Sequence, residues 1–411
     1  MRERRRAGRL RLTATALGAI VAGLGGGSLA LATHFARKVL TPAVRPDARV
    51  TVWAIEDDAA APGGRRVWIH GPDAALPGEY SFIFDGGSGH ARLGPVVDRV
   101  LDVGSSGARG SGVDRVAREV VAVDRGELRV GARGRVTGWW YTDPAELGLE
   151  TERVVIPVDG GLTWAWLVRP EPGAEQEGRW AVHVHGRGAL PEEALRGVRP
   201  LARAGVTSLV LAYRNDPGAP RGLRGRYGLG IAERRDVDDA ISYAIAHGAR
   251  RVTLVGWSMG GTASVLAAGR GPHRSVVDGL VLDSPALDWP SLLLRQAALV
   301  RLPSAFARLA MRLMQRGWVR GAVPGAKGTD LGALTAEELA GGLRVPVLIH
   351  ASADDTYVPW GGSLRVAQLR PELVTLREAA GEHVKLWNVD PGAWERATEE
   401  FVRALPAPGS A

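Results

Sequence analysis

The chain has 411 residues, of which 45% are hydrophobic and 23% are charged, so it can bury more than one core and lacks the composition of a disordered protein. The formal net charge is +8, but residues 1–38 carry seven of those charges and the remainder is close to neutral, which argues against a nucleic-acid-binding face. The absence of cysteine excludes disulfides, thiolate nucleophiles and Cys-ligated zinc. Arginine far outnumbers lysine, a bias typical of a high-GC bacterial gene.

Residues 12–35 contain no Asp, Glu, Lys or Arg. This uncharged run is long enough for a helix to cross a hydrocarbon core of about 30 Å. Residues 1–11 are rich in arginine, so the positive-inside rule predicts a basic cytoplasmic tail, a single-pass transmembrane anchor and an extracytoplasmic remainder. The alternative is a cleaved signal peptide and a secreted protein, since Ala30-Leu-Ala32 has the form of a cleavage site.

Residues 44–149 consist of short apolar runs between turn signals and predict a small β-rich domain. The predicted strands are 50–55, 66–69, 80–84, 119–123 and 135–140. Glycine-rich stretches, of which 104–112 is the longest, predict loops. No catalytic constellation is present here, and we interpret His70 and His90 as structural or incidental rather than as metal ligands.

Strand and helix patterns alternate over residues 150–405, which predicts an α/β domain. The predicted strands are 154–158, 162–168, 180–184, 206–213, 252–255, 279–283, 345–350 and 374–378. The principal predicted helices are 192–204, 230–246, 261–268 and 393–405. Residues 285–340 interrupt the alternation with apolar helical patterns and predict a cap.

A nucleophile elbow is predicted where the strand at 252–255 ends, at Gly256-Trp-Ser258-Met-Gly260, which has the G-x-S-x-G form. A serine on a sharp turn between a strand and a helix is lifted out of the sheet. Glycines two residues to either side let the strand and the helix pass close together without a Cβ collision.

This order of elements resembles the α/β-hydrolase superfamily over about residues 151–405. In that superfamily the nucleophile follows the fifth strand, the acid the seventh and the histidine the eighth. Here Ser258 is followed by Asp354-Asp355-Thr-Tyr-Val-Pro359 and then by His383, each after a predicted strand. The motifs are most similar to the serine aminopeptidase and prolyl-oligopeptidase-like branch. The resemblance implies a mostly parallel eight-stranded sheet flanked by helices, with a helical cap.

The resemblance also implies a catalytic triad of Ser258, His383 and Asp355. A serine hydroxyl needs a base within hydrogen-bond reach, and the carboxylate orients that base and stabilises the imidazolium. The superfamily pattern places the acid four residues before Pro359, at Asp355. Counting forward from the preceding strand favours Asp354, which stays open as the alternative acid.

An oxyanion hole needs two backbone N–H groups aimed at the developing charge. The resemblance implies the N–H of Met259 and, from the loop after the third strand, the N–H of Arg187. His183 and His185 in the same segment can also be interpreted as a metal pair, but the other histidines supply no convincing further ligands. We therefore predict no metal site and no cofactor.

Two further features have alternative interpretations. Arg214 either contacts an anionic substrate or forms a structural ion pair with Asp216 or Asp236. The apolar residues of the predicted cap either line an acyl or side-chain pocket or pack on the sheet: Trp289, Leu292, Leu293, Leu294, Phe306, Leu309 and Met314.

The sequence thus predicts a membrane-anchored, extracytoplasmic serine hydrolase, an esterase or a peptidase, that forms an acyl-enzyme. Its expected partners are a small-molecule ester or peptide substrate and, through the N-terminal helix, the membrane, with no nucleic acid. One alternative is a catalytically silent protein that binds a partner at the cell surface, and another is an acyltransferase with the same triad. The triad does not separate ester from amide substrates.

Overall fold

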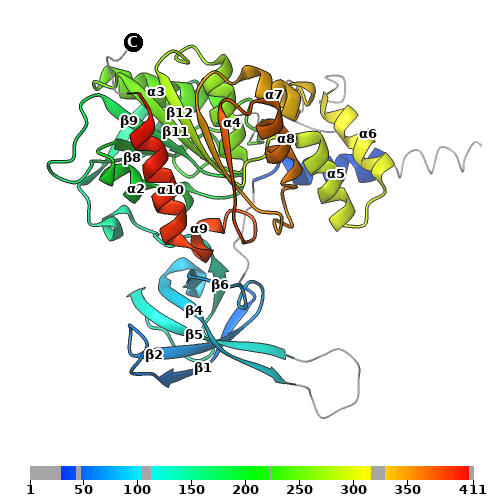
Figure 1. Cartoon of the computed structure of the whole chain (residues 1–411). Coiled ribbons are helices and arrows are strands. Elements are labelled where there is room, and N and C mark those ends of the chain that lie inside the picture. The colour runs from blue at the N-terminus through cyan, green and yellow to red at the C-terminus, as the bar shows by residue number, and fades with distance from the viewer. Residues whose placement is uncertain (1–28, 43–47, 103–112, 223–224, 316–328, 407–411) are drawn as a thin grey trace, which may run out of the picture.

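The computed structural model describes residues 29–42, 48–102, 113–222, 225–315 and 329–406. These residues form a β-barrel and a larger α/β domain (Figure 1). The predicted membrane segment 12–35 lies outside the described residues except for its last seven. In the part of the chain that is described, no helix combines the length and apolar character needed to cross a bilayer.

Six antiparallel strands close the barrel in the order β1-β2-β5-β4-β3-β6. They are β1 (Val50–Asp57), β2 (Arg65–His70), β3 (Tyr80–Phe84), β4 (Gly89–Asp102), β5 (Val113–Arg125) and β6 (Arg133–Thr137). Alternate apolar side chains fill the interior, among them Val52, Val67, Ile69, Phe82 and Leu93. The β-rich domain predicted from the sequence is therefore a closed barrel.

Strand β4 has no counterpart among the predicted strands, although it is the longest in the barrel. Its sequence contains Gly94-Pro95, which reads as an interruption because proline cannot donate to a sheet ladder. The pairing of β4 with β5 shifts register between Leu93 and Val96, so the proline lies at a bulge.

The α/β domain is built on an eight-stranded sheet in the order β14-β13-β12-β11-β9-β10-β8-β7. Its strands are β7 (Thr151–Val158), β8 (Gly161–Val168), β9 (Arg179–Val184), β10 (Thr207–Leu211), β11 (Arg251–Trp257), β12 (Val277–Asp283), β13 (Val347–Ala351) and β14 (Val374–Glu378). The first two form the predicted antiparallel hairpin, and β9 to β14 are mutually parallel. Their carboxyl ends therefore meet at one edge of the sheet.

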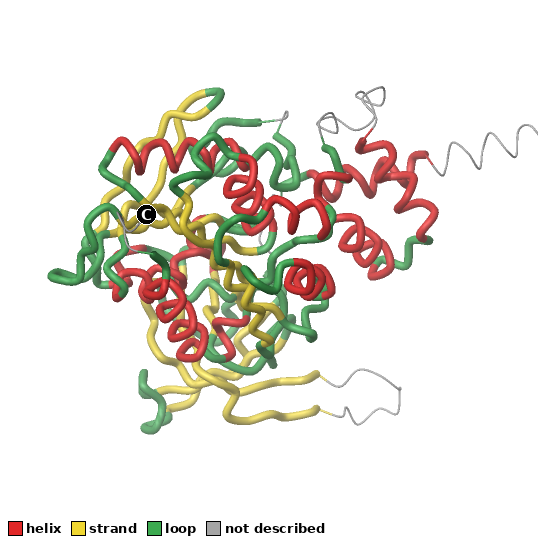
Figure 2. Tube along the Cα trace, turned by 45° about the horizontal axis from the view of Figure 1, so that its top comes forward, coloured by secondary structure: helices red, strands yellow, loops and turns green. Residues whose placement is uncertain are grey.

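Helices cover both faces of this sheet (Figure 2). They are α2 (Val198–Arg203), α3 (Arg234–Ala246), α4 (Met259–Arg270), α7 (Ala336–Gly342), α8 (Gly361–Leu369), α9 (Leu386–Val389) and α10 (Pro391–Ala404). The predicted cap contributes α5 (Trp289–Leu299) and α6 (Ser304–Gln315). The helix expected over 192–204 is a 3₁₀ turn at Pro191–Gly197 followed by the short α2.

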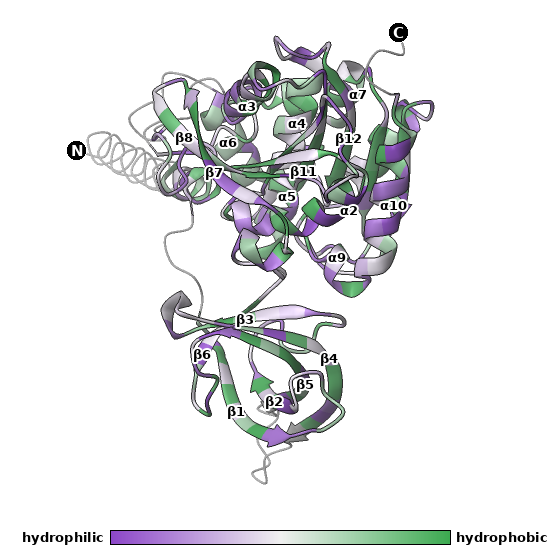
Figure 3. Ribbon diagram, turned by 90° about the vertical axis from the view of Figure 1, so that its left-hand side faces the viewer, coloured by the Kyte–Doolittle hydropathy of each residue, from purple (hydrophilic) through white to green (hydrophobic). Residues whose placement is uncertain are grey.

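The barrel docks on the α/β domain beside α9, as two views of the molecule show (Figures 1 and 3). The fully buried Asn388 makes the principal polar contacts, donating from Nδ2 to the carbonyl oxygens of Glu79 and Gly138. Its Oδ1 accepts a hydrogen bond from Arg196 of the α/β domain. One side chain thus links both parts of the molecule in a buried interface.

Residues 29–40 form a helical segment that packs against the α/β domain near α5 and α6 (Figure 1). Its buried face consists of Ala32, Phe35, Ala36, Val39 and Leu40. The carbonyl oxygens at its end accept hydrogen bonds from Arg187 and from the backbone N–H of Tyr227. These bonds satisfy acceptors that a helix C-terminus leaves free.

Candidate active site

Ser258 sits on a strained turn between β11 and α4, with φ 50° and ψ −116°. A positive φ is costly for a residue with a side chain and persists only where the surrounding structure imposes it. A Cβ on Gly260 would lie 2.1 Å from the carbonyl oxygen of Val184, and one on Gly256 would lie 2.7 Å from the Cα of Gly261. Both glycines are therefore required by close backbone approach, as the motif predicts.

The three side chains predicted as a triad form one hydrogen-bonded chain. His383 Nε2 lies 2.9 Å from Ser258 Oγ, and His383 Nδ1 lies 2.7 Å from Asp355 Oδ2. The carboxylate accepts at Nδ1, so Nε2 is left to accept the serine proton. Residues 125 positions apart in the chain are brought together because the parallel strands end at the same edge.

Asp355, and not Asp354, faces the histidine. Its second oxygen, Oδ1, accepts hydrogen bonds from the backbone N–H groups of Tyr357 and Val358, each at 2.8 Å. These two bonds hold the carboxylate so that Oδ2 points at His383. Asp354 is exposed, and its backbone N–H is bound by Ser352.

The backbone that follows His383 is held in an unusual conformation. Val384 has φ 52°, which is an outlier for a β-branched residue. Its N–H donates to Ser284 Oγ at 3.1 Å, and its carbonyl accepts from Arg196 at 2.9 Å. Two buried side chains from distant elements therefore fix the loop that presents His383, and no local motif in the sequence indicates either one.

The loop that carries His383 is also joined to the loop that carries Asp355. The Glu382 carboxylate accepts hydrogen bonds from the backbone N–H and the hydroxyl of Thr356. The ring of Tyr357 packs against that of His383 with centroids 5.1 Å apart. These contacts hold the two loops in a fixed position relative to each other, next to the His383 ring.

Two backbone N–H groups next to Ser258 are available for an anion. Neither Met259 nor Arg187 donates its N–H to another group in the described part of the chain. The N–H of Met259 is at the start of α4, where helical N–H groups lack partners and the helix dipole favours negative charge. The neighbouring N–H of Gly186 is taken by the buried Glu193 carboxylate at 2.7 Å, which leaves Arg187 as the donor on this loop.

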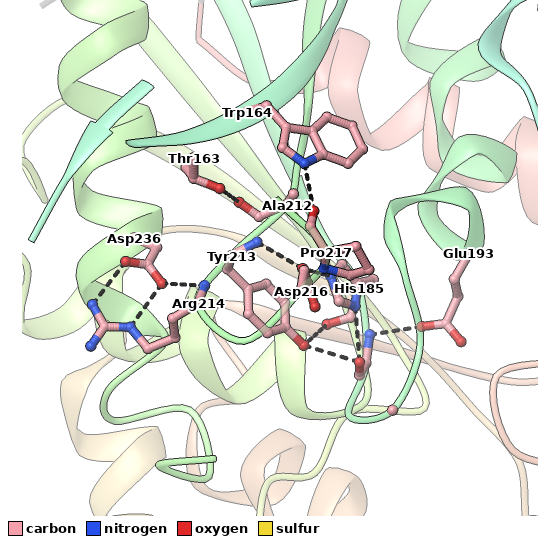
Figure 4. Close-up of polar contacts among 12 residues, drawn as sticks. Thr163, Trp164, His185, Glu193, Ala212, Tyr213, Arg214, Asp216, Pro217 and Asp236 are labelled. Carbon is pink, nitrogen blue, oxygen red and sulfur yellow. Dashed lines mark hydrogen bonds and ion pairs between the residues drawn. The ribbon is translucent and has the colours of Figure 1, made fainter. Parts of the chain in front are cut away.

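A buried polar cluster supports the loop of Gly186 and Arg187 (Figure 4). Tyr213 donates its hydroxyl proton to the carbonyl oxygens of His185 and Gly186. Asp216 lies 2.8 Å from His185 Nε2 and accepts the backbone N–H of Tyr213. The loop is thus held in place by side chains of the segment that follows β10.

The contacts of His185 favour its protonated form. Its Nδ1 faces the carbonyl oxygen of Gly186 and its Nε2 faces the Asp216 carboxylate; both partners are acceptors, so both nitrogens donate. Burial by itself lowers the pKa of His185, but the Asp216 carboxylate outweighs burial and the pKa is raised. His183, by contrast, is buried beside Ser208, and burial lowers its pKa to about 3.

The nitrogens that these partners engage are both nitrogens of His185 and Nε2 of His183. One ring binds a hydroxyl and the other is engaged at both nitrogens. Among the described residues, no group of three or more side chains is arranged to hold a metal ion.

Ser258 stands where two cavities meet. A polar cavity of about 390 Å³ is lined by His383, Glu382 and Lys385, and by Asp73 of the barrel. An apolar cavity of about 220 Å³ lies on the other side. The side chains of Arg187 and Tyr357 line both cavities and are hydrogen-bonded to each other, so they form the partition between them.

The sequence profile of the alpha/beta hydrolase family matches residues 181–403, more than half of the chain. The chain belongs to the alpha/beta hydrolase family. A separate profile, of a domain of unknown function (DUF8805), matches residues 51–137, which span the barrel. A search of curated proteins found no match.

Solved structures similar to this hydrolase include the esterase Pf2001 of Pyrococcus furiosus, with a TM-score of 0.48 and 16% identity over 64% of this chain and 95% of that one. Est1E from Butyrivibrio proteoclasticus has a TM-score of 0.43 and 18% identity, covering 61% of this chain and 96% of that one. An alpha-beta hydrolase from Vibrio vulnificus has a TM-score of 0.46 and 16% identity, covering 63% of this chain and 82% of that one.

Arg214 of the hydrolase has a structural role. Its guanidinium binds both oxygens of Asp236 at 2.8 Å, and both residues are buried. Of the apolar cap residues, Trp289, Leu292 and Leu293 line the apolar cavity. The other four have no place among its lining residues: Leu294, Phe306, Leu309 and Met314.

We predict that Asp216→Asn destabilises the hydrolase in a pH-dependent way. The folded pKa of His185 is raised, so the ion pair stabilises the fold fully below the unfolded pKa of about 6.5 and is lost as pH rises through the folded pKa. Removing one partner of a buried pair costs about 3 kcal/mol, or roughly 6–12 °C in Tm. Thermal unfolding should show a larger decrease in Tm, relative to wild type, at pH 6 than at pH 9. An equal loss at both pH values would show that His185 is not protonated.

Proposed function

We propose that this protein is a serine hydrolase that cleaves carboxylic esters through an acyl-enzyme. The observation that carries the proposal is the continuous hydrogen-bonded chain from Ser258 through His383 to Asp355, at an elbow that faces two unpaired backbone N–H groups. A nucleophile, a base, an orienting carboxylate and nearby N–H donors are the groups that acyl transfer uses, and their presence together supports the proposal.

In the proposed mechanism, Ser258 Oγ attacks the ester carbonyl carbon and its proton passes to His383 Nε2. The N–H groups of Met259 and Arg187 bind the oxyanion of the tetrahedral intermediate. Collapse of the intermediate releases the alcohol, which takes the proton from His383. Water then attacks the acyl-enzyme by the same route, giving the carboxylic acid and free Ser258.

The polar cavity favours an ester over the N-terminal residue of a peptide. An aminopeptidase needs a carboxylate to bind the substrate ammonium group, but the three carboxylates here are each engaged within the protein, and the Lys385 cation beside them repels an ammonium group. Asp73 pairs with Lys385, Glu382 binds Thr356, and Glu193 accepts the N–H of Gly186.

We predict that a fluorophosphonate probe labels the wild-type protein and not the Ser258→Ala variant. The probe phosphonylates a serine only where a base and an oxyanion hole activate it. Labelling is read by intact-protein mass spectrometry. A folded wild-type protein that stays unlabelled would favour the silent binding protein over the enzyme.

We predict that Asp355→Asn lowers kcat on p-nitrophenyl acetate by about 10³–10⁴-fold, because an amide stabilises the wrong tautomer of the histidine. The matched control is Asp354→Asn, one residue away on an exposed position, which should stay within about two-fold of wild type. The reverse ranking of the two variants would assign the acid to Asp354.

We also propose that the enzyme is anchored in the membrane with its catalytic domain extracytoplasmic. Because residues 29–35 pack on the α/β domain, the proposed anchor consists of residues 12–28, whose length of 17 residues is at the lower end of the range for a spanning helix. The lack of charge in this run and the arginines before it support the orientation. The packing of Ala32, Phe35 and Val39 on the hydrolase supports retention of the segment, because cleavage after Ala32 would divide the helical segment 29–40.

The full-length protein expressed in a bacterial host should therefore sediment with the membranes. It should resist a high-salt wash and be released by detergent with its N-terminal residues intact by mass spectrometry. A soluble product that begins at Thr33 would instead establish signal-peptide cleavage.

A further inference from the structure

The apolar cavity beside Ser258 has two walls that are far apart in the chain. One wall is α5 of the cap, through Trp289, Leu292 and Leu293. The other is the helical segment 29–40, through Phe35 and Val39. Residues that precede both domains in the chain thus line the same cavity as the proposed nucleophile, Ser258.

The position of His383 determines which half of an ester enters which cavity. The general acid must protonate the departing oxygen, so the alcohol lies on the side of His383. His383 lines the polar cavity and is not among the residues that line the apolar one. The acyl group is therefore directed to the apolar side of the partition formed by Arg187 and Tyr357.

The helical segment is fastened to the same loop that supplies the oxyanion N–H. Arg187 donates from its guanidinium to the carbonyl oxygen of Val39 and binds Tyr357 through another nitrogen. The cavity reaches the surface at Val300, which is 56% exposed, so a chain longer than the cavity can extend outward.

We propose that the helical segment 29–40 is one wall of the acyl-binding pocket, and that Phe35 and Val39 set the length of the acyl chain that the enzyme accepts. The inference rests on the proposed ester hydrolysis and names its substrate class, an ester of an apolar acyl chain with a polar alcohol. Each buried methylene contributes a factor of about four in affinity, so a pocket shortened by two methylenes loses about ten-fold or more.

The test measures kcat/KM for p-nitrophenyl acetate and p-nitrophenyl octanoate in the full-length protein. Val39→Trp should fill the pocket and lower the octanoate-to-acetate ratio by about ten-fold or more. The matched control is His34→Trp, which places the same ring on the exposed face of the same helical segment and should leave the ratio within about two-fold. Phe35→Ala should shift the ratio in the opposite direction, toward the longer chain.

A binding measurement separates failure of the pocket from failure of the enzyme. Decanoate is titrated into Ser258→Ala by calorimetry, with and without Val39→Trp, and the second substitution should weaken binding by about ten-fold or more. Decanoate binding that depends on Val39 in a protein that hydrolyses no ester would support the pocket and refute the proposed hydrolase. The inference would be overturned if Val39→Trp and Phe35→Ala changed neither the octanoate-to-acetate ratio nor the affinity for decanoate.

Discussion

The close approach between α4 and the end of β9 is the constraint on which the rest of the site depends. Gly260 brings the helix to the carbonyl of Val184 at a distance that no side chain allows. This contact places the start of α4 directly beside the loop of Arg187, so that two N–H groups from different elements can face one oxygen atom. It acts together with the hydrogen bonds of the Ser258 backbone to Asp283 and Ala286, which also impose the positive φ of Ser258.

The other contacts of the site each fix the orientation of a side chain or loop that could otherwise adopt several conformations. Asp355 is aimed by the N–H groups of its own turn, and the His383 loop is held by Ser284 and Arg196. His185, paired with Asp216, supports the loop of Gly186 and Arg187. Preorganised dipoles of this kind are effective because they do not have to reorient during the reaction.

Two segments outside the α/β fold complete the surroundings of the nucleophile. Asp73 of the barrel pairs with Lys385 at the edge of the polar cavity, and the helical segment 29–40 lines the apolar one. The barrel is held in this position by Asn388, whose amide is bonded to both domains. Parts of the chain that precede the α/β domain thus line both cavities beside Ser258.

The sequence by itself determined the elbow, the order of strands around it and the residues able to act as base and acid, because these depend on local spacing and on where each strand ends. It did not predict β4, whose Gly94-Pro95 dipeptide is accommodated in the strand only by a bulge. Tertiary structure decided between Asp354 and Asp355, because only the folded turn directs one carboxylate at His383. It also decided the contacts of Ser284, Arg196 and the helical segment 29–40. Their contacts join residues that are distant in the chain, and such contacts leave no periodic or local pattern in the sequence.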